Sequence, residues 1–228
     1  MGLLNLKALT DKPLATDPFD YVIVEGFVGE KGRASIIGGF PDIQDAGSFP
    51  LSELQIGQGL TALIDELNGQ AFRSAVETKF GVDLSGAPTM FTLRGRCDAR
   101  DGRIHTDSKK KLITVLLYLN DAEWEAEGGR LRLLRNGETL NDTVAEISPR
   151  FGNLLVFKRS DNSWHGHEPY IGPRRVLQMN WVVSDSVAAW EQWRHKVSAA
   201  FKRAFRKSPE SAGKRRPQMA AARLAAKS

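Results

Sequence analysis

Histidines and one aspartate at two distant places in the chain have the types and the spacing that bind a metal ion. His105 and Asp107 lie two residues apart in an extended segment before an apolar run, so their side chains point to the same face. An imidazole nitrogen and a carboxylate oxygen can therefore reach one ion. A third ligand has to come from elsewhere, and the stretch 163–167 offers both His165 and His167.

Two imidazoles and one carboxylate on one side of a metal are a ligand set that suits non-haem Fe(II). This set leaves three coordination positions open, for O2 and for a cosubstrate. A His-x-Asp pair by itself is a weak signal, because the spacing is common in chains that bind no metal. The prediction therefore depends on the rest of the sequence.

The segment 175–183 adds an arginine in an unusual place. On a strand, Arg175 shares one face with Leu177, Met179 and Trp181. If this face lines the interior of a barrel, the guanidinium needs an anionic partner, and a ligand carboxylate would supply one. The alternative is an exposed strand end with Arg175 in water.

Taken together, these residues resemble the Fe(II)/2-oxoglutarate-dependent dioxygenases, and among them the prolyl 4-hydroxylase-like branch. The resemblance covers about residues 89–183. Its motifs are His105-x-Asp107, the strand 114–121 with Tyr118, the glycine-led stretch 127–133, the strand 152–157, His165, and Arg175 ten residues after His165.

The resemblance implies a set of site residues and cofactors. His105, Asp107 and His165 would bind Fe(II), with His165 preferred to His167 as the third ligand. Arg175 and Tyr118 would bind the far carboxylate of 2-oxoglutarate. O2 is the oxidant, ascorbate is expected to stimulate turnover, and succinate and CO2 are released.

The resemblance also bears on the reaction and its substrate. Because halogenating relatives lack the carboxylate ligand, Asp107 favours hydroxylation. The expected substrate is a protein or peptide side chain such as proline, ahead of a small metabolite or a sugar-containing molecule. An alternative of another class is a non-catalytic, metal-binding jelly-roll scaffold that docks through its basic tail.

The elements that must position these residues follow from hydrophobic spacing. Helices are expected at 29–38 and in two pieces of 59–80 that Asn68-Gly69 separates. Short strands are expected at 21–24, 89–97, 103–106, 111–119, 130–134, 144–147, 153–158, 163–167 and 175–183. The predicted fold is mainly β with flanking helices, namely a double-stranded β-helix or jelly roll with N-terminal helices and a basic C-terminal helix.

The chain divides by composition into four parts. Residues 1–18 form a polar lead-in, 19–186 the oxygenase domain with a jelly-roll core of about 89–183, 187–207 an amphipathic basic helix, and 208–228 a disordered basic tail. From residue 194 onward there are eleven basic residues and one acid, whereas residues 1–193 carry 21 basic and 26 acidic residues. An anionic membrane surface or an acidic partner is therefore expected to contact 187–228, ahead of nucleic acid.

Bulk composition restricts the compartment. A single cysteine, Cys97, allows no disulfide within the chain, which fits a reducing environment. No run of about 18 apolar residues is present in the sequence. We therefore expect a cytoplasmic protein, associated at most with a membrane surface.

Overall fold

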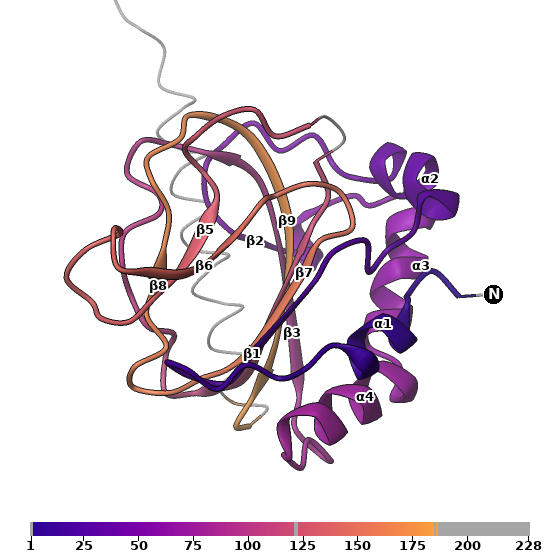
Figure 1. Ribbon diagram of the computed structural model, residues 1–228. Helices are drawn as coiled ribbons and strands as arrows, with labels where there is room; N and C mark the ends of the chain where they lie inside the picture. Colours follow the sequence, from indigo (N-terminus) through magenta and orange to yellow (C-terminus); the bar gives the residue numbers. More distant parts are fainter. Residues whose placement is uncertain (1, 121–122, 185, 187–228) are drawn as a thin grey trace, which may run out of the picture.

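The computed structural model describes residues 2–120, 123–184 and 186. Six strands form a large antiparallel sheet in the order β1-β7-β4-β9-β3-β2, and three form a small antiparallel sheet in the order β6-β5-β8. The strands of the large sheet are β1 (Tyr21–Val24), β2 (Phe49–Pro50), β3 (Thr89–Cys97), β4 (Lys111–Tyr118), β7 (Leu154–Lys158) and β9 (Gly172–Val182). Those of the small sheet are β5 (Leu131–Leu134), β6 (Thr143–Ile147) and β8 (His165–Gly166). The two sheets face each other, as a double-stranded β-helix requires (Figure 1).

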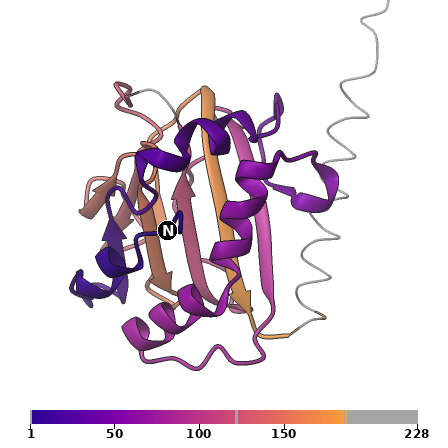
Figure 2. The ribbon, with the colours of Figure 1, turned by 90° about the vertical axis from the view of Figure 1, so that its right-hand side faces the viewer.

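Helices cover the other face of the large sheet. They are α1 (Leu6–Asp11), α2 (Arg33–Gly38), α3 (Gln58–Leu67) and α4 (Gln70–Phe80), with short 3₁₀ turns at Glu30–Gly32 and Leu51–Glu53. Figure 2 shows these helices in front of the large sheet. The fold therefore has three layers: the helices, the large sheet and the small sheet.

The central strands of the large sheet are buried on both faces, and alternation assigns each side chain to one of two cores. On β9, Leu177, Met179 and Trp181 pack in the core under the helices, whereas Val176 packs in the core between the two sheets. On β4, Val115 belongs to the helix-side core by the same period of two. Everything on the even-numbered face of β9 therefore points toward the space between the sheets.

Most of the predicted elements are present. The break between α3 and α4 falls at Asn68-Gly69 as expected, and β1, β3, β4, β5, β6, β7, β8 and β9 lie at predicted positions. The predicted strand at 103–106 is wrong, because only an isolated bridge, His105 with His165, forms there.

The description of residues 1–18 as a loose lead-in missed a helix. α1 begins after Asn5, whose side chain accepts a hydrogen bond from the backbone N–H of Ala8 and so caps the helix. Leu9 from this helix is fully buried. The lead-in therefore packs on the helical layer.

The predicted helix at 187–207 and the tail at 208–228 lie outside the described residues. Within the described residues, no helix has the length and apolar character needed to cross a membrane.

Candidate metal centre

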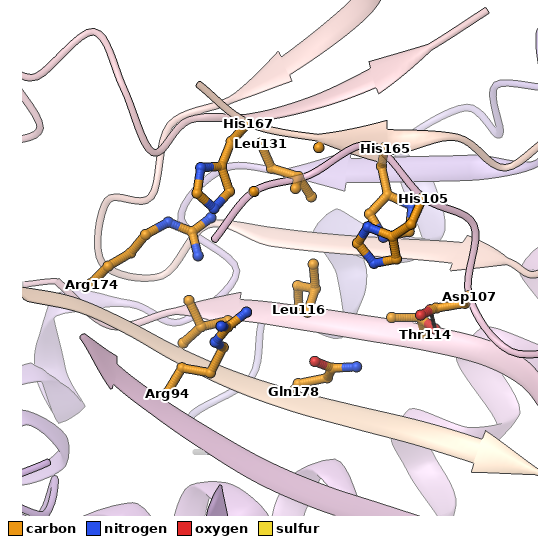
Figure 3. Close-up of a pocket in the computed structure, with 13 residues that line it drawn as sticks. Arg94, His105, Asp107, Thr114, Leu116, Leu131, His165, His167, Arg174 and Gln178 are labelled. Carbon is orange, nitrogen blue, oxygen red and sulfur yellow. Dashed lines mark hydrogen bonds between the residues drawn. The ribbon is translucent and has the colours of Figure 1, made fainter. Parts of the chain in front are cut away.

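His105, Asp107 and His165 converge between the two sheets, with one potential ligand atom from each within 4.8 Å of the others. The backbone brings the two histidines together, because His105 and His165 exchange N–H to carbonyl hydrogen bonds of 3.0 Å in both directions. Their rings lie 4.3 Å apart between centroids. Figure 3 shows both imidazoles beside Asp107 at one end of a cavity.

Local hydrogen bonds select the imidazole nitrogen that can bind a metal. The Nδ1 of His105 lies 2.8 Å from the carbonyl of Arg103, and the Nδ1 of His165 lies 2.9 Å from the carbonyl of Ser163. A carbonyl oxygen only accepts, so each Nδ1 carries the proton and each Nε2 keeps a free lone pair. Burial, with His105 nearby, also lowers the pKa of His165 to about 4, so the ring is neutral at pH 7.

Asp107 is buried and held by two side chains. The ammonium of Lys111 lies 2.8 Å from Oδ1, and the hydroxyl of Thr114 donates to Oδ2 at 2.5 Å. Burial by itself would raise the pKa of Asp107, but the ammonium charge of Lys111 and the hydrogen bonds from Lys111 and Thr114 act against burial, and the pKa lies below its ordinary value. The group is therefore an anionic ligand at neutral pH, and each carboxylate oxygen has a second lone pair for a metal.

The choice of His165 rather than His167 as the third residue of the cluster agrees with this geometry. His167 is also buried, but its ring lies beside Arg174, at the other end of the cavity (Figure 3). Its Nδ1 is 2.8 Å from the carbonyl of Glu168, and burial together with Arg174 lowers its pKa to about 4. His167 therefore lines the cavity without belonging to the metal cluster.

The cavity that joins these groups measures about 90 Å³. Apolar side chains form part of its wall, namely Leu116, Leu131 and Val176. Its polar lining comprises Arg94, His105, Asp107, Thr114, His165, His167, Arg174 and Gln178. Two arginines therefore lie at the end opposite the metal cluster.

The prediction that Arg175 points into the barrel is wrong, because Arg174 takes that place. The Arg175 guanidinium lies over the ring of Phe40 on the helix side, at 5.4 Å from the ring centroid. Arg174 is 4 % exposed, lines the cavity, and approaches the hydroxyl of Tyr118 to 3.4 Å. The error came from taking the more apolar face of β9 as the barrel interior, whereas that face packs against the helices.

Sequence reasoning also missed Thr114, Lys111, Gln178 and Asn180 around the metal cluster. One signal could have found the two residues of β9. Arg174, Gln178 and Asn180 are polar residues at even positions of a strand whose odd positions 177, 179 and 181 are large and apolar. In a strand buried on both faces, a row of polar side chains marks the face that lines a site.

Comparison with known proteins agrees with this geometry. Residues 96–183 match the family described as "2OG-Fe(II) oxygenase superfamily", a range that includes all three residues of the metal cluster. No protein among the curated ones is significantly similar to the sequence.

Solved structures share the fold at low sequence identity. A Pseudomonas putida prolyl-4-hydroxylase is 16 % identical with a TM-score of 0.52, over 80 % of this chain and 96 % of that one. A Phytophthora capsici prolyl 4-hydroxylase is 18 % identical with a TM-score of 0.53, over 81 % and 67 %. An oxidoreductase of the 2OG-Fe(II) oxygenase family from Burkholderia pseudomallei is 11 % identical with a TM-score of 0.50, over 78 % and 89 %. Residues 96–183 of this chain thus match the 2OG-Fe(II) oxygenase superfamily, and within this range His105, Asp107 and His165 form the metal triad.

Proposed function

We propose that this protein is a 2OG-Fe(II) oxygenase that binds 2-oxoglutarate through Arg174 and hydroxylates a peptide or protein side chain. The observation that carries the cosubstrate site is the charge of Arg174. Its guanidinium is buried, and its hydrogen-bond partners among the described residues are the carbonyl of Gly129, the hydroxyl of Tyr118 and the side chain of Cys97, none of them a carboxylate. A buried cation without a carboxylate partner is costly, so an anionic ligand is expected to complete the site.

The second arginine of the cavity supports an anion at this end. The Nη2 of Arg94 is bound to Asp101 at 2.7 Å, whereas its Nε is buried without a hydrogen-bond partner. Arg94 and Arg174 together carry one more positive charge than Asp101 neutralises. A dicarboxylate that reaches the metal at one end would place its far carboxylate at these arginines (Figure 3).

The side chains around the cavity would have separate roles in this reaction. Fe(II) and 2-oxoglutarate, when bound, supply the O2 chemistry, with succinate and CO2 as products. The triad orients the metal, the hydroxyl of Tyr118 lies beside Arg174 to accept or donate a hydrogen bond, and the apolar wall limits the access of water.

A groove beside the cavity supports an extended substrate. It measures about 640 Å³ and lies between the segments 99–104 and 138–141, and it shares Gly102 and His167 with the metal cavity. An open groove of this kind admits a peptide segment more readily than an enclosed pocket does. Since the structural neighbours include prolyl 4-hydroxylases, proline is the first side chain to test.

The test is turnover with a peptide library of which one half contains proline. Incubation with Fe(II), 2-oxoglutarate and ascorbate should release succinate and add 16 mass units to a peptide. His105→Ala should abolish both signals. Succinate release without any modified peptide would support the oxygenase activity but contradict a peptide substrate, and a small metabolite would then be the substrate to test.

A further inference from the structure

We propose that Gln178, Asn180 and Thr114 form a hydrogen-bond relay that positions Asp107 for the metal. The relay begins at the cavity wall and ends on the ligand carboxylate. It rests on the metal triad, not on the identity of the substrate. Gln178, Asn180 and Thr114 are positioning residues, because they act through Asp107.

The relay consists of three consecutive hydrogen bonds. The Nε2 of Gln178 lies 3.0 Å from Oδ1 of Asn180, and the Nδ2 of Asn180 lies 2.8 Å from Oγ1 of Thr114. The hydroxyl of Thr114 then donates to Oδ2 of Asp107 at 2.5 Å. Asn180 and Thr114 are at most 1 % exposed, so water does not compete for these bonds.

The carboxylate at the end fixes the direction of every bond. Ionised Asp107 only accepts, so the hydroxyl of Thr114 has to donate to it. This leaves a lone pair of Thr114 for the amide nitrogen of Asn180, and the amide oxygen of Asn180 then accepts from Gln178. All three donors therefore point toward Asp107, and bonds aligned in this way strengthen one another.

The strand register builds the relay. Thr114 and Asn180 are direct partners across β4 and β9, and the next pair on the same face is Leu116 with Gln178. Directly opposed side chains have Cβ atoms about 4.5–5.5 Å apart, which suits a short hydrogen bond. A buried amide without partners would cost about 1–3 kcal/mol, and the relay avoids that cost for Asn180.

The consequence for the metal is a fixed carboxylate. Thr114 holds Oδ2, Lys111 contacts Oδ1, and Arg159 donates to the backbone carbonyl of Asp107 at 3.2 Å. Both carboxylate oxygens are thus held in place, and each retains a second lone pair for a metal. Removing the hydroxyl of Thr114 should therefore weaken metal binding, and it also leaves the buried amide nitrogen of Asn180 without its partner.

The test measures Co(II) binding to the full chain by calorimetry and by the visible absorption of bound Co(II). Thr114→Val is nearly isosteric and removes the donor to Asp107, so the Co(II) dissociation constant should rise about tenfold, as is typical for groups that hold a metal ligand. Thr114→Ser keeps the hydroxyl and should bind like the wild type. Gln178→Leu breaks only the first bond and should give a smaller but measurable loss.

Thr92→Val is the matched control. Thr92 is a buried threonine on β3, paired with Gln178 in register, and its hydroxyl takes no part in the relay. Its variant should bind Co(II) like the wild type. The proposal would be overturned if Thr114→Val bound Co(II) as tightly as the wild type. If Thr114→Val fails to fold, Gln178→Leu takes its place, because Gln178 is only partly buried and the site tolerates the change. Wild-type Co(II) affinity in Gln178→Leu would also overturn the proposal. A wild type that binds no Co(II) would overturn the triad itself.

Discussion

At the scale of single residues, the metal site depends on hydrogen bonds to carbonyls two residues away. His105 and His165 both direct Nδ1 to the carbonyl at position i−2, so the same local geometry presents Nε2 twice. This pattern explains how two unrelated stretches of chain supply equivalent ligands. Which histidine converges is decided by the exchange of backbone hydrogen bonds between His105 and His165.

The two neighbouring arginines of β9 provide a residue-scale prediction. Arg174→Leu should weaken 2-oxoglutarate binding roughly 10- to 100-fold, since a hydrogen bond to a charged group contributes about 1.5–3 kcal/mol. Calorimetry of 2-oxoglutarate binding to the Mn(II)-loaded protein measures the change without turnover. Arg175→Leu is the control, because its guanidinium lies over Phe40, and it should leave the affinity unchanged. A larger effect at Arg175 than at Arg174 would restore the interpretation made from the sequence.

At the scale of elements, the segment between β3 and β4 forms the wall between cavity and groove. Gly102 in this segment has φ +88°, and an added Cβ would lie 2.4 Å from Nδ1 of His167. The close approach lets the backbone cover the imidazole. Glycine is therefore required at position 102 for two reasons, the positive φ and the contact with His167.

This fit predicts that Gly102→Ala destabilises more than a change that adds strain only. Gly86 has φ +74° with nothing near its missing Cβ, so Gly86→Ala should lose about 1–3 kcal/mol from backbone strain. Gly102→Ala adds the collision with His167, and its free energy of unfolding in urea should fall further. Equal losses in the two variants would mean that the wall yields to the added methyl group.

At the scale of the whole molecule, the helical layer and the site lie on opposite faces of the same sheet. Phe72 of α4 stacks on Trp181 of β9 with ring centroids 5.9 Å apart, and both side chains are at most 1 % exposed. The other face of β9 bears Gln178 and Asn180. Stability and metal binding should therefore be separable.

The prediction is that Phe72→Ala lowers the free energy of unfolding by about 3–5 kcal/mol, as expected for a large core side chain. The folded fraction should still bind Co(II) with the affinity of the wild type, because the triad and the relay are on the other face. Ile171→Ala at a 69 % exposed position is the control and should unfold like the wild type. Urea unfolding followed by tryptophan fluorescence measures the free energy of unfolding of both variants. A large loss of Co(II) affinity in Phe72→Ala would show that the two faces are coupled.

Much of the fold could be predicted because its signals are local. The break at Asn68-Gly69 and the long apolar strand at 111–119 depend on turn propensity and periodicity, which act over a few residues. The strand predicted at 103–106 is absent because only one residue pair, His105 with His165, forms a β-bridge there, and neighbouring residues do not extend it. The capped helix α1 was missed because six residues give little periodicity.

By itself, the sequence determined the chemistry of the site. His105 and Asp107 were identifiable because metal ligands require particular residue types, and a spacing of two puts both side chains on one side of an extended chain. His165 was preferred to His167 from the family resemblance. Only the tertiary structure decided which face of β9 is the interior. Alternation separates Arg174 from Arg175 but does not say which of two buried faces meets the helices and which meets the second sheet. That assignment depends on layers built from distant parts of the chain, and the same layers bring Thr114 and Asn180 into register beside Asp107.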